Sequence, residues 1–224
     1  MNRLKLLMQA SLKFIIGVPL VAVLLFLPAG TWDYPNGWLF MGLLFIPMCC
    51  VGIILLIKSL EMLRKRLNSD EKEDQQKWLI LISAVLFISG FVTAGLNYRY
   101  SWFILPQWVV IAASILLLFG YALWAEVMRE NAFLSRTVEI QENQKVVDTG
   151  LYGIVRHPMY VAALLLFLSI PLVLGSVISF IIFLGFIPVL IRRIRNEEEV
   201  LEQGLDGYKE YKQKVKFRLI PFIW

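Results

Sequence analysis

Residues 149–167 read TGLYGIVRHPMYVAALLLF and pass from a polar turn into a continuous apolar run. Pro158 fixes its own φ and disfavours helical geometry at the preceding residue, so a helix is predicted to begin at this proline. Arg156 and His157, the only histidine among the 224 residues, therefore lie at the start of an apolar helix. The stretch predicts a helix that enters a membrane from a polar connection.

Apolar runs of similar length recur along the chain, which is 58% hydrophobic and has a mean hydropathy of +0.69. Such runs are typical of membrane spans and not of a soluble core. We therefore predict an all-α, polytopic membrane protein with about six membrane segments, of which the last two form a short helical hairpin. The predicted segments are residues 12–29, 37–58, 78–97, 103–125, 159–174 and 176–191.

The last two runs are short, at roughly 24 Å each against a hydrocarbon core of about 30 Å. One helix through both would be roughly 50 Å long and would carry the charged C-terminal tail across the membrane. A tight turn at Gly175 and Ser176 avoids this, with Pro171 and Pro188 as candidate kink positions. We therefore expect a hairpin that returns the tail to the side from which it entered.

The distribution of basic residues predicts the orientation. Six segments place both termini on one side, and of the 22 lysines and arginines only Arg99 falls on the opposite side. The positive-inside rule then places the termini and both long loops in the cytoplasm, with the protein in the inner membrane if the host is bacterial. The basic N-terminus resembles a signal peptide, but we expect an uncleaved anchor because later spans follow. Topology thus explains the net charge of +5, and no nucleic-acid partner is expected.

The chain divides into two parts of one continuous membrane domain. Residues 1–127 are predicted to form four transmembrane helices, and residues 128–224 a cytoplasmic connection, the hairpin and the tail. The connection around residues 126–152 mixes polar and apolar residues, and its length indicates an ordered functional segment.

The C-terminal tail carries apolar side chains at spacings of three and four residues, which predicts a cytoplasmic amphipathic helix. Gly204 and Gly207 are expected to interrupt it. The apolar stripe could pack against the membrane face or against the preceding connection. It consists of Val200, Leu201, Leu205, Tyr208 and Tyr211.

Two short stretches carry the candidate functional side chains. In the first, Arg156 and His157 precede Pro158; an interfacial anchor and a first-turn proline would explain them equally well. In the second, RRIRNEEEVL, Arg193 and Glu197 are four residues apart and share a helix face. They could pair with each other or hold opposite ends of a zwitterion, although a solvated helix start is the common reading of such a charge block.

Tyr152 and Tyr160 flank the histidine. Tyrosines are common at membrane interfaces, so alone they indicate little. Together with the two charged stretches they gather aromatic, cationic and anionic groups near one interface. This combination favours a place where a polar cofactor is held beside a lipid-borne substrate.

Several site classes are excluded. The chain has no GxGxxG, no P-loop and no GxSxG motif, so a soluble nucleotide domain and a nucleophile elbow are not encoded. Cys49 and Cys50 are adjacent within an apolar run, and one histidine cannot complete a metal cluster. No metal site is expected.

The segments VVDTGLYGIVRHPMYVA, RIRNEEEVL and GYKEYKQKVKFRLIP form an ordered and fairly specific set. Together they resemble the integral-membrane methyltransferase family that includes isoprenylcysteine carboxyl methyltransferases and phospholipid methyltransferases. The resemblance covers roughly residues 126–224, and the first four segments match only in character.

The resemblance implies S-adenosyl-L-methionine bound without a Rossmann domain, in a pocket made by the connection, the hairpin, the tail and the turn formed by Arg156, His157 and Pro158, here called the RHP turn. Gln144 is a candidate contact because relatives often have a histidine near this position, and Arg193 would face the acceptor. The cofactor carries a sulfonium, an ammonium and a carboxylate. Glu197 could meet the ammonium, and Arg156 or His157 the carboxylate or the adenine edge. The cofactor-lining residues implied by the motifs are Tyr152, His157, Pro158, Tyr160 and Glu197, with Glu198 as a second contact.

The implied reaction is methyl transfer to a hydrophobic, lipid-like or prenylated acceptor from the bilayer. The protein mainly aligns donor and acceptor and excludes water. A carboxylate acceptor needs no base, whereas an amine must lose a proton, which His157 or a glutamate could take. We therefore predict an enzyme with Arg193 and His157 as catalytic candidates, and the acceptor is left open as a carboxylate, an amine or a thiol.

Two alternatives stand beside this reading. A membrane sterol or enone reductase would take NADPH, and the Arg192, Arg193 and Arg195 group could be read as a site for its 2′-phosphate. A transporter or scaffold would more often show broken spans or buried charges, and only Glu126, near a span end, comes close.

Overall fold

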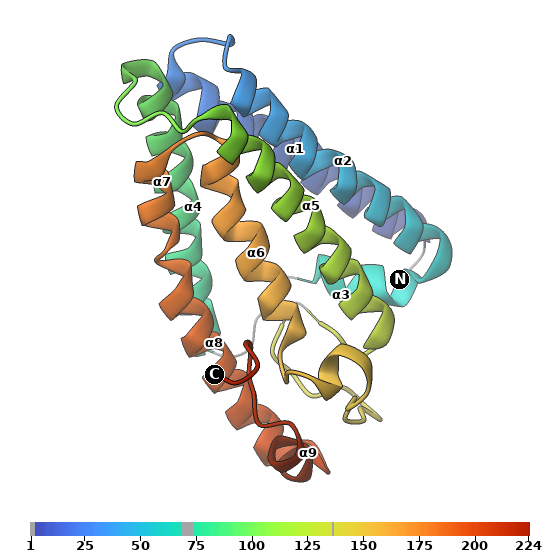
Figure 1. Ribbon diagram of the computed structural model, residues 1–224. Helices are drawn as coiled ribbons and strands as arrows, with labels where there is room; N and C mark the ends of the chain where they lie inside the picture. The colour runs from blue at the N-terminus through green and yellow to red at the C-terminus, as the bar shows by residue number, and fades with distance from the viewer. Residues whose placement is uncertain (1–2, 69–73, 136) are drawn as a thin grey trace.

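The computed structural model describes residues 3–68, 74–135 and 137–224, which form a helical bundle (Figure 1). These ranges contain no β-strand, only an isolated bridge between Ile104 and Ser176. The predicted all-α class is therefore confirmed. In chain order the elements are α1 (Arg3–Ala29), α2 (Pro35–Lys58), α3 (Leu60–Leu67), α4 (Asp74–Tyr100), α5 (Gln107–Glu130), η1 (Gly150–Gly153), α6 (Pro158–Val173), α7 (Val177–Phe183), α8 (Phe186–Gly204) and α9 (Tyr208–Lys214).

Five helical segments within the described residues are long and apolar enough to cross a membrane. They are Arg3–Ala29, Pro35–Lys58, Gln76–Tyr100, Gln107–Glu130 and Val177–Gly204. The shorter α6 is also apolar and has 16 residues. Large apolar side chains such as Leu20, Ile46 and Ile115 are exposed along the first, second and fifth helices, as expected of surfaces that face lipid. The predicted polytopic membrane fold is confirmed.

The hairpin turns at Gly175, where φ is +77°, a backbone conformation that glycine adopts without steric cost. Its second arm differs from the predicted 176–191. The arm consists of α7 and α8, and the break between them lies at Leu184 and Gly185. Pro188 does not break the arm because it lies in the first turn of α8, where a backbone N–H would have no helical partner anyway.

The charged block after residue 191 continues α8 to Gly204 and does not start a separate tail helix. Arginine and glutamate are good helix formers, so nothing in this block ends the helix. Val177–Gly204 spans 28 residues, or roughly 42 Å, and its C-terminal part extends past the start of α6 (Figure 1). This extension brings the acidic residues of α8 beside the RHP turn.

Glycines let the helices approach closely at two crossings. A Cβ built on Gly90 of α4 would lie 2.1 Å from the Phe183 ring of α7, and one on Gly95 would lie 2.4 Å from the backbone oxygen of Leu25 in α1. Small residues at helix crossings are a common packing device within membranes, because dispersion contacts drive association there. The core around these crossings is rich in aromatic residues, which include Phe40, Phe91, Phe183 and Phe186.

Both termini lie toward the end of the bundle that carries α3, η1 and α9 (Figure 1). This arrangement agrees with an even number of crossings. Which side of a membrane this end faces stays a prediction from the distribution of lysine and arginine.

The short helix α3 was not predicted, because residues 58–77 read as a charged loop. The Ser59 side chain accepts a hydrogen bond from the backbone N–H of Met62 at its start. Met62 and Leu63 are buried, so an apolar face fixes the helix against the bundle. Its last turn carries Arg64, Lys65 and Arg66.

Candidate functional site

A cavity of about 390 Å³ lies at the end of the bundle that carries the termini. Its walls come from α3 to α6, from the connection after α5, from α8 and from the C-terminal tail. One part of the lining is apolar and the other is polar and aromatic. The apolar part includes Leu79, Ile80, Leu166, Phe167, Val189 and Leu190, and the polar part includes Tyr152, Arg156, His157, Tyr160, Arg193 and Glu197.

The C-terminal tail holds the RHP turn by its backbone. The N–H of Arg156 donates to the Phe217 oxygen at 2.9 Å, and the N–H of His157 donates to the Arg218 oxygen at 3.0 Å. α6 begins at Pro158, with His157 as the residue before the first turn. The proline thus ends the connection as predicted, and the tail fixes the height of the histidine.

Glu198 of α8 is buried against the RHP turn and collects several cationic partners. Its Oε1 accepts from Nε of Arg156 at 2.8 Å and lies 3.2 Å from Nε2 of His157, while its Oε2 accepts from Nε of Arg218 at 2.9 Å. Arg156 also donates through Nη1 to the backbone oxygens of Val215 and Lys216, at 2.7 and 2.8 Å. The hydrogen bonds of the Arg156 guanidinium therefore link the RHP turn to α8 and to the tail.

Arg193 and Glu197 are linked through Tyr160. The Tyr160 hydroxyl donates to Oε2 of Glu197, and Nε of Arg193 donates to the same hydroxyl at 3.0 Å. All three residues line the cavity. A carboxylate offers about four acceptor positions, so Glu197 can accept further hydrogen bonds from a ligand.

Tyr152 and Gln144 also line the cavity, from η1 and from the connection. The Tyr152 backbone oxygen accepts from the Tyr211 hydroxyl at 2.7 Å. Burial raises the pKa of Tyr152 to about 12, so its phenol is a hydrogen-bond donor at neutral pH. The Gln144 side-chain oxygen accepts from the Gln141 N–H at 2.9 Å, which fixes the turn that presents it.

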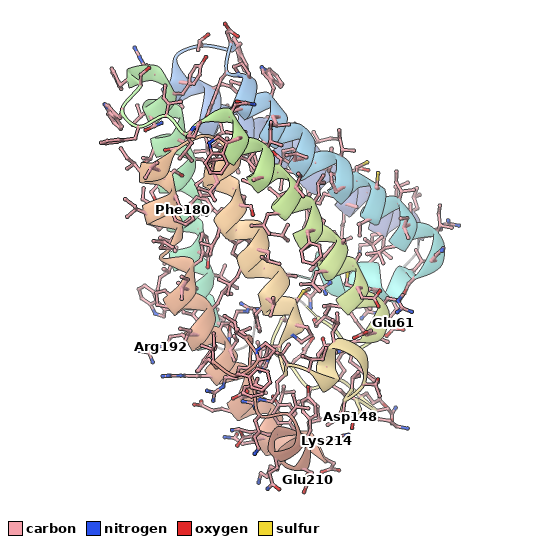
Figure 2. The ribbon with its side chains drawn as sticks, viewed as in Figure 1. Glu61, Asp148, Phe180, Arg192, Glu210 and Lys214 are labelled. Carbon is pink, nitrogen blue, oxygen red and sulfur yellow. The ribbon has the colours of Figure 1, made fainter. Side chains whose placement is uncertain are left out.

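The tail packs against the connection, which is one of the two positions expected for its apolar stripe. Tyr208, Tyr211 and Val215 form a buried cluster with partly buried Val146 and Leu201. An ion pair between Lys214 and Asp148, 2.7 Å apart, ties the same two segments at the surface, where both residues are labelled (Figure 2). The connection and the tail therefore form one wall.

Two residues expected to contact a cofactor lie outside the cavity lining. Pro158 starts α6 and is buried, and Glu198 lies behind the wall with its cationic partners. Both residues instead contact or form part of the RHP turn. It brings the other candidates to the cavity: Gln144, Tyr152, Arg156, His157, Tyr160, Arg193 and Glu197.

Arg66, Trp124 and Tyr208 were missed by the sequence analysis as site residues, and all three line the cavity. The Arg66 guanidinium lies 5.4 Å from the centre of the Trp124 ring. Arg66 was counted only as a topological charge, and nothing in its loop marked it as different from Arg64. The Tyr208 hydroxyl is buried without a hydrogen-bond partner in the described part of the chain. Its place in the apolar stripe had indicated only a packing residue.

The arginines 192, 193 and 195 do not form one cluster. Arg193 lines the cavity, whereas Arg192 and Arg195 are exposed, and Arg192 points outward from the bundle (Figure 2). Cys49 and Cys50 are exposed on α2. Over residues 3–68, 74–135 and 137–224, no group of three or more His, Cys, Asp or Glu side chains is placed to hold a metal ion.

Residues 108–206 match the family model described as phospholipid methyltransferase. This segment runs from α5 through the RHP turn into the charged end of α8. The match confirms the resemblance to integral-membrane methyltransferases that the motifs indicated. The segment also contains every sequence-predicted site residue.

The chain is also similar to curated sterol reductases. It is 29% identical over 91 residues to Delta(14)-sterol reductase TM7SF2 of Mus musculus, covering 39% of this chain and 22% of that protein. It is 23% identical over 171 residues to a Delta(14)-sterol reductase of Methylotuvimicrobium alcaliphilum, covering 69% of this chain and 40% of that protein. The chain therefore spans less than half the length of either reductase.

Proposed function

We propose that this protein is an S-adenosyl-L-methionine-dependent methyltransferase that acts on a hydrophobic, membrane-borne acceptor. The observation that carries the proposal is one cavity with two kinds of lining. Its polar part presents Glu197, Tyr160 and Arg193, and its apolar part is formed by membrane helices. Such a cavity suits a polar methyl donor beside an apolar acceptor. The family match over residues 108–206 supports the same reaction class.

The lining fits the charges of the cofactor. Glu197 is the acidic group bound to Tyr160 at the cavity, so it is the candidate for the ammonium. Arg156 is committed to Glu198 and two carbonyl oxygens, which makes it a poorer partner for the carboxylate than expected. The buried Tyr208 hydroxyl is a better one, because it lines the cavity and has no partner among the described residues.

When bound, adenosylmethionine would supply an electrophilic methyl group. The chain's own residues would orient it: Glu197 and Tyr208 at its polar end, and Tyr152 and Gln144 along the wall formed by the connection. His157 is held by Glu198 at 3.2 Å and could accept the proton of an amine acceptor. Arg193, fixed by Tyr160, remains the candidate group facing the acceptor. The surrounding apolar side chains would exclude water.

The second candidate function is an NADPH-dependent membrane reductase, favoured by the similarity to two Delta(14)-sterol reductases. One observation weighs against it. Arg192 and Arg195 are exposed, so a triple-arginine site for a 2′-phosphate is not assembled at the cavity.

Thermal unfolding of the detergent-purified protein discriminates the two functions. A ligand that binds the folded state raises the melting temperature in a concentration-dependent manner. We expect adenosylhomocysteine to stabilise the protein and NADPH to leave it unchanged. Stabilisation by NADPH alone would replace the methyltransferase proposal with the reductase.

A further inference from the structure

Arg66 places a partly buried guanidinium in the cavity wall. Its Nε and Nη2 atoms are buried and make no hydrogen bond within the part of the chain that the structure describes. Burial lowers its pKa to about 10, so it still carries its charge at neutral pH. Leaving buried guanidinium nitrogens unpaired is costly, and native proteins usually satisfy such groups with protein, water or a ligand. An unpaired arginine that lines a cavity therefore indicates a ligand with an acceptor group.

The other cations of α3 have different surroundings. Lys65 pairs with Glu61 at 3.0 Å and donates to the Ala132 oxygen at 3.0 Å, and Arg64 is exposed. Arg66 alone of these three lines the cavity. The buried residues Met62 and Leu63 hold the helix, so Arg66 is directed inward by the register of the helix.

Two other arginines at the cavity already have hydrogen-bonding partners. Arg156 is bound by Glu198, and Arg193 donates to Tyr160. Glu197, the nearby acid, accepts from the same tyrosine. Arg66 therefore gives its side of the cavity a positive charge. Its guanidinium lies 5.4 Å from the centre of the Trp124 ring, and Tyr152 and Tyr160 act on its pKa in the upward direction, against the larger effect of burial.

The cavity continues from this polar region along apolar side chains. Leu166 and Phe167 of α6 line it and also line a second cavity of about 260 Å³ deeper in the bundle. The walls of that second cavity are almost entirely apolar and include Phe40, Phe87 and Leu117. A chain of methylene or isoprene groups suits such walls, whereas a free polar metabolite does not.

We propose that Arg66 binds an anionic group, a carboxylate or a phosphate, on an acceptor whose apolar chain extends along Leu166 and Phe167. This inference rests on the proposed function, since it names the substrate class of the same cavity. A guanidinium can donate two parallel hydrogen bonds to either anion, which fixes orientation as well as charge. A carboxylate could be the methylated group itself, and a phosphate would belong to a phospholipid headgroup.

The test compares how tightly the full protein, in a non-ionic maltoside detergent, binds three amphiphiles. All three have the same sixteen-carbon chain and differ only in the head group. The probes are hexadecanoate, hexadecyl phosphate and hexadecanol, and the readout is the concentration that gives half of the maximal thermal stabilisation. We expect at least one anion to bind about tenfold more tightly than the alcohol. The anion that binds more tightly identifies the carboxylate or the phosphate source.

Arg66→Gln should remove the preference for the anion over the alcohol, whereas Arg66→Lys should retain part of it. Arg64→Gln is the matched control on the exposed face of α3 and should behave as the wild type. Equal binding of all three probes to the wild type, or no binding of any, contradicts the inference. So does an Arg66→Gln variant that keeps the preference.

Titration with adenosylhomocysteine separates this inference from the proposed function. We expect Arg66→Gln to bind adenosylhomocysteine as the wild type does. A matching loss of adenosylhomocysteine affinity would assign Arg66 to the cofactor and overturn the inference. A wild type that fails to bind adenosylhomocysteine would contradict the proposed function, while the three amphiphiles would still decide whether Arg66 recognises an anion.

Discussion

Nε of Arg156 donates to Oε1 of Glu198 across 2.8 Å, and both side chains are buried although they lie 42 residues apart in the sequence. This contact joins the turn before α6 to the helix that leaves the membrane. His157 lies 3.2 Å from the same carboxylate oxygen. The position of the only histidine therefore depends on a residue that does not itself line the cavity.

Replacing Glu198 with Gln should destabilise the fold strongly. The change removes the negative charge that faces Arg156, His157 and Arg218, and leaving one side of a buried ion pair uncompensated costs about 3–5 kcal/mol. Thermal unfolding in detergent measures the loss. Glu199→Gln, at an exposed position one residue further along α8, is the control and should change the melting temperature little. Equal melting temperatures for the two variants would show that the Glu198 contacts contribute nothing.

Tyr208→Phe should weaken adenosylhomocysteine binding with little loss of stability. Burial raises the pKa of Tyr208 above its usual value, so the hydroxyl remains a donor, and it has no partner among the described residues. Loss of a hydrogen bond to a charged group corresponds to about tenfold or more in affinity. Calorimetric titration measures it.

Tyr211→Phe is the matched comparison for Tyr208→Phe. Its hydroxyl donates to the Tyr152 backbone oxygen at 2.7 Å, so its removal should lower the free energy of unfolding by about 1 kcal/mol. The loss of adenosylhomocysteine affinity should be smaller than in Tyr208→Phe. The reverse order, with Tyr211→Phe the weaker binder and Tyr208→Phe unaffected, would remove Tyr208 from the cofactor site.

Gly90→Val should prevent normal packing of α4 against α7. Even one added carbon at Gly90 would lie 2.1 Å from the Phe183 ring, and overpacking a core typically costs about 1–3 kcal/mol or more. Gly52→Val in α2 is the control, because a Cβ there meets nothing within 4 Å. We expect a lower melting temperature and lower yield only for Gly90→Val, and partial rescue when Phe183→Leu is added. A Gly90→Val protein as stable as wild type would contradict the close crossing.

Tyr160→Phe should lower turnover more than it lowers cofactor affinity. The Tyr160 hydroxyl donates to Glu197 and accepts from Arg193. Its loss removes the hydrogen bond that holds Arg193, the residue proposed to face the acceptor. The measurement is methyl transfer from labelled adenosylmethionine to a membrane lipid extract, with KM and kcat compared. An unchanged kcat would show that the position of Arg193 does not depend on this hydroxyl.

Periodicity and composition predicted the all-α membrane fold, because apolar runs and their separators are local features of the sequence. The end of α8 was misplaced since Arg192 marks a change in polarity but not a break in helix geometry, and the helix continues to Gly204. The RHP turn was located by proline chemistry alone. Local pattern therefore sufficed at Pro158 and at Gly175, but not at Pro188, which lies in the first turn of α8 and does not break the helix.

The partners of the site residues could not be read from local pattern. Spacing put Arg193 and Glu197 on one face of a helix, but only the fold places Tyr160 between them. Adjacent glutamates 197 and 198 looked alike in the sequence, yet one lines the cavity and the other lies behind it. Arg66 was indistinguishable from Arg64 until the register of α3 was known.

The most direct test of the account is calorimetric titration of the detergent-purified protein with adenosylhomocysteine, comparing wild type, Glu197→Gln and Glu199→Gln. Glu197 lines the cavity whereas Glu199 is exposed on the same helix, so the two variants differ in their proposed access to the cofactor. The account predicts binding to the wild type and to Glu199→Gln, and affinity reduced about tenfold or more in Glu197→Gln. Equal affinity in all three proteins, or none in the wild type, would contradict it.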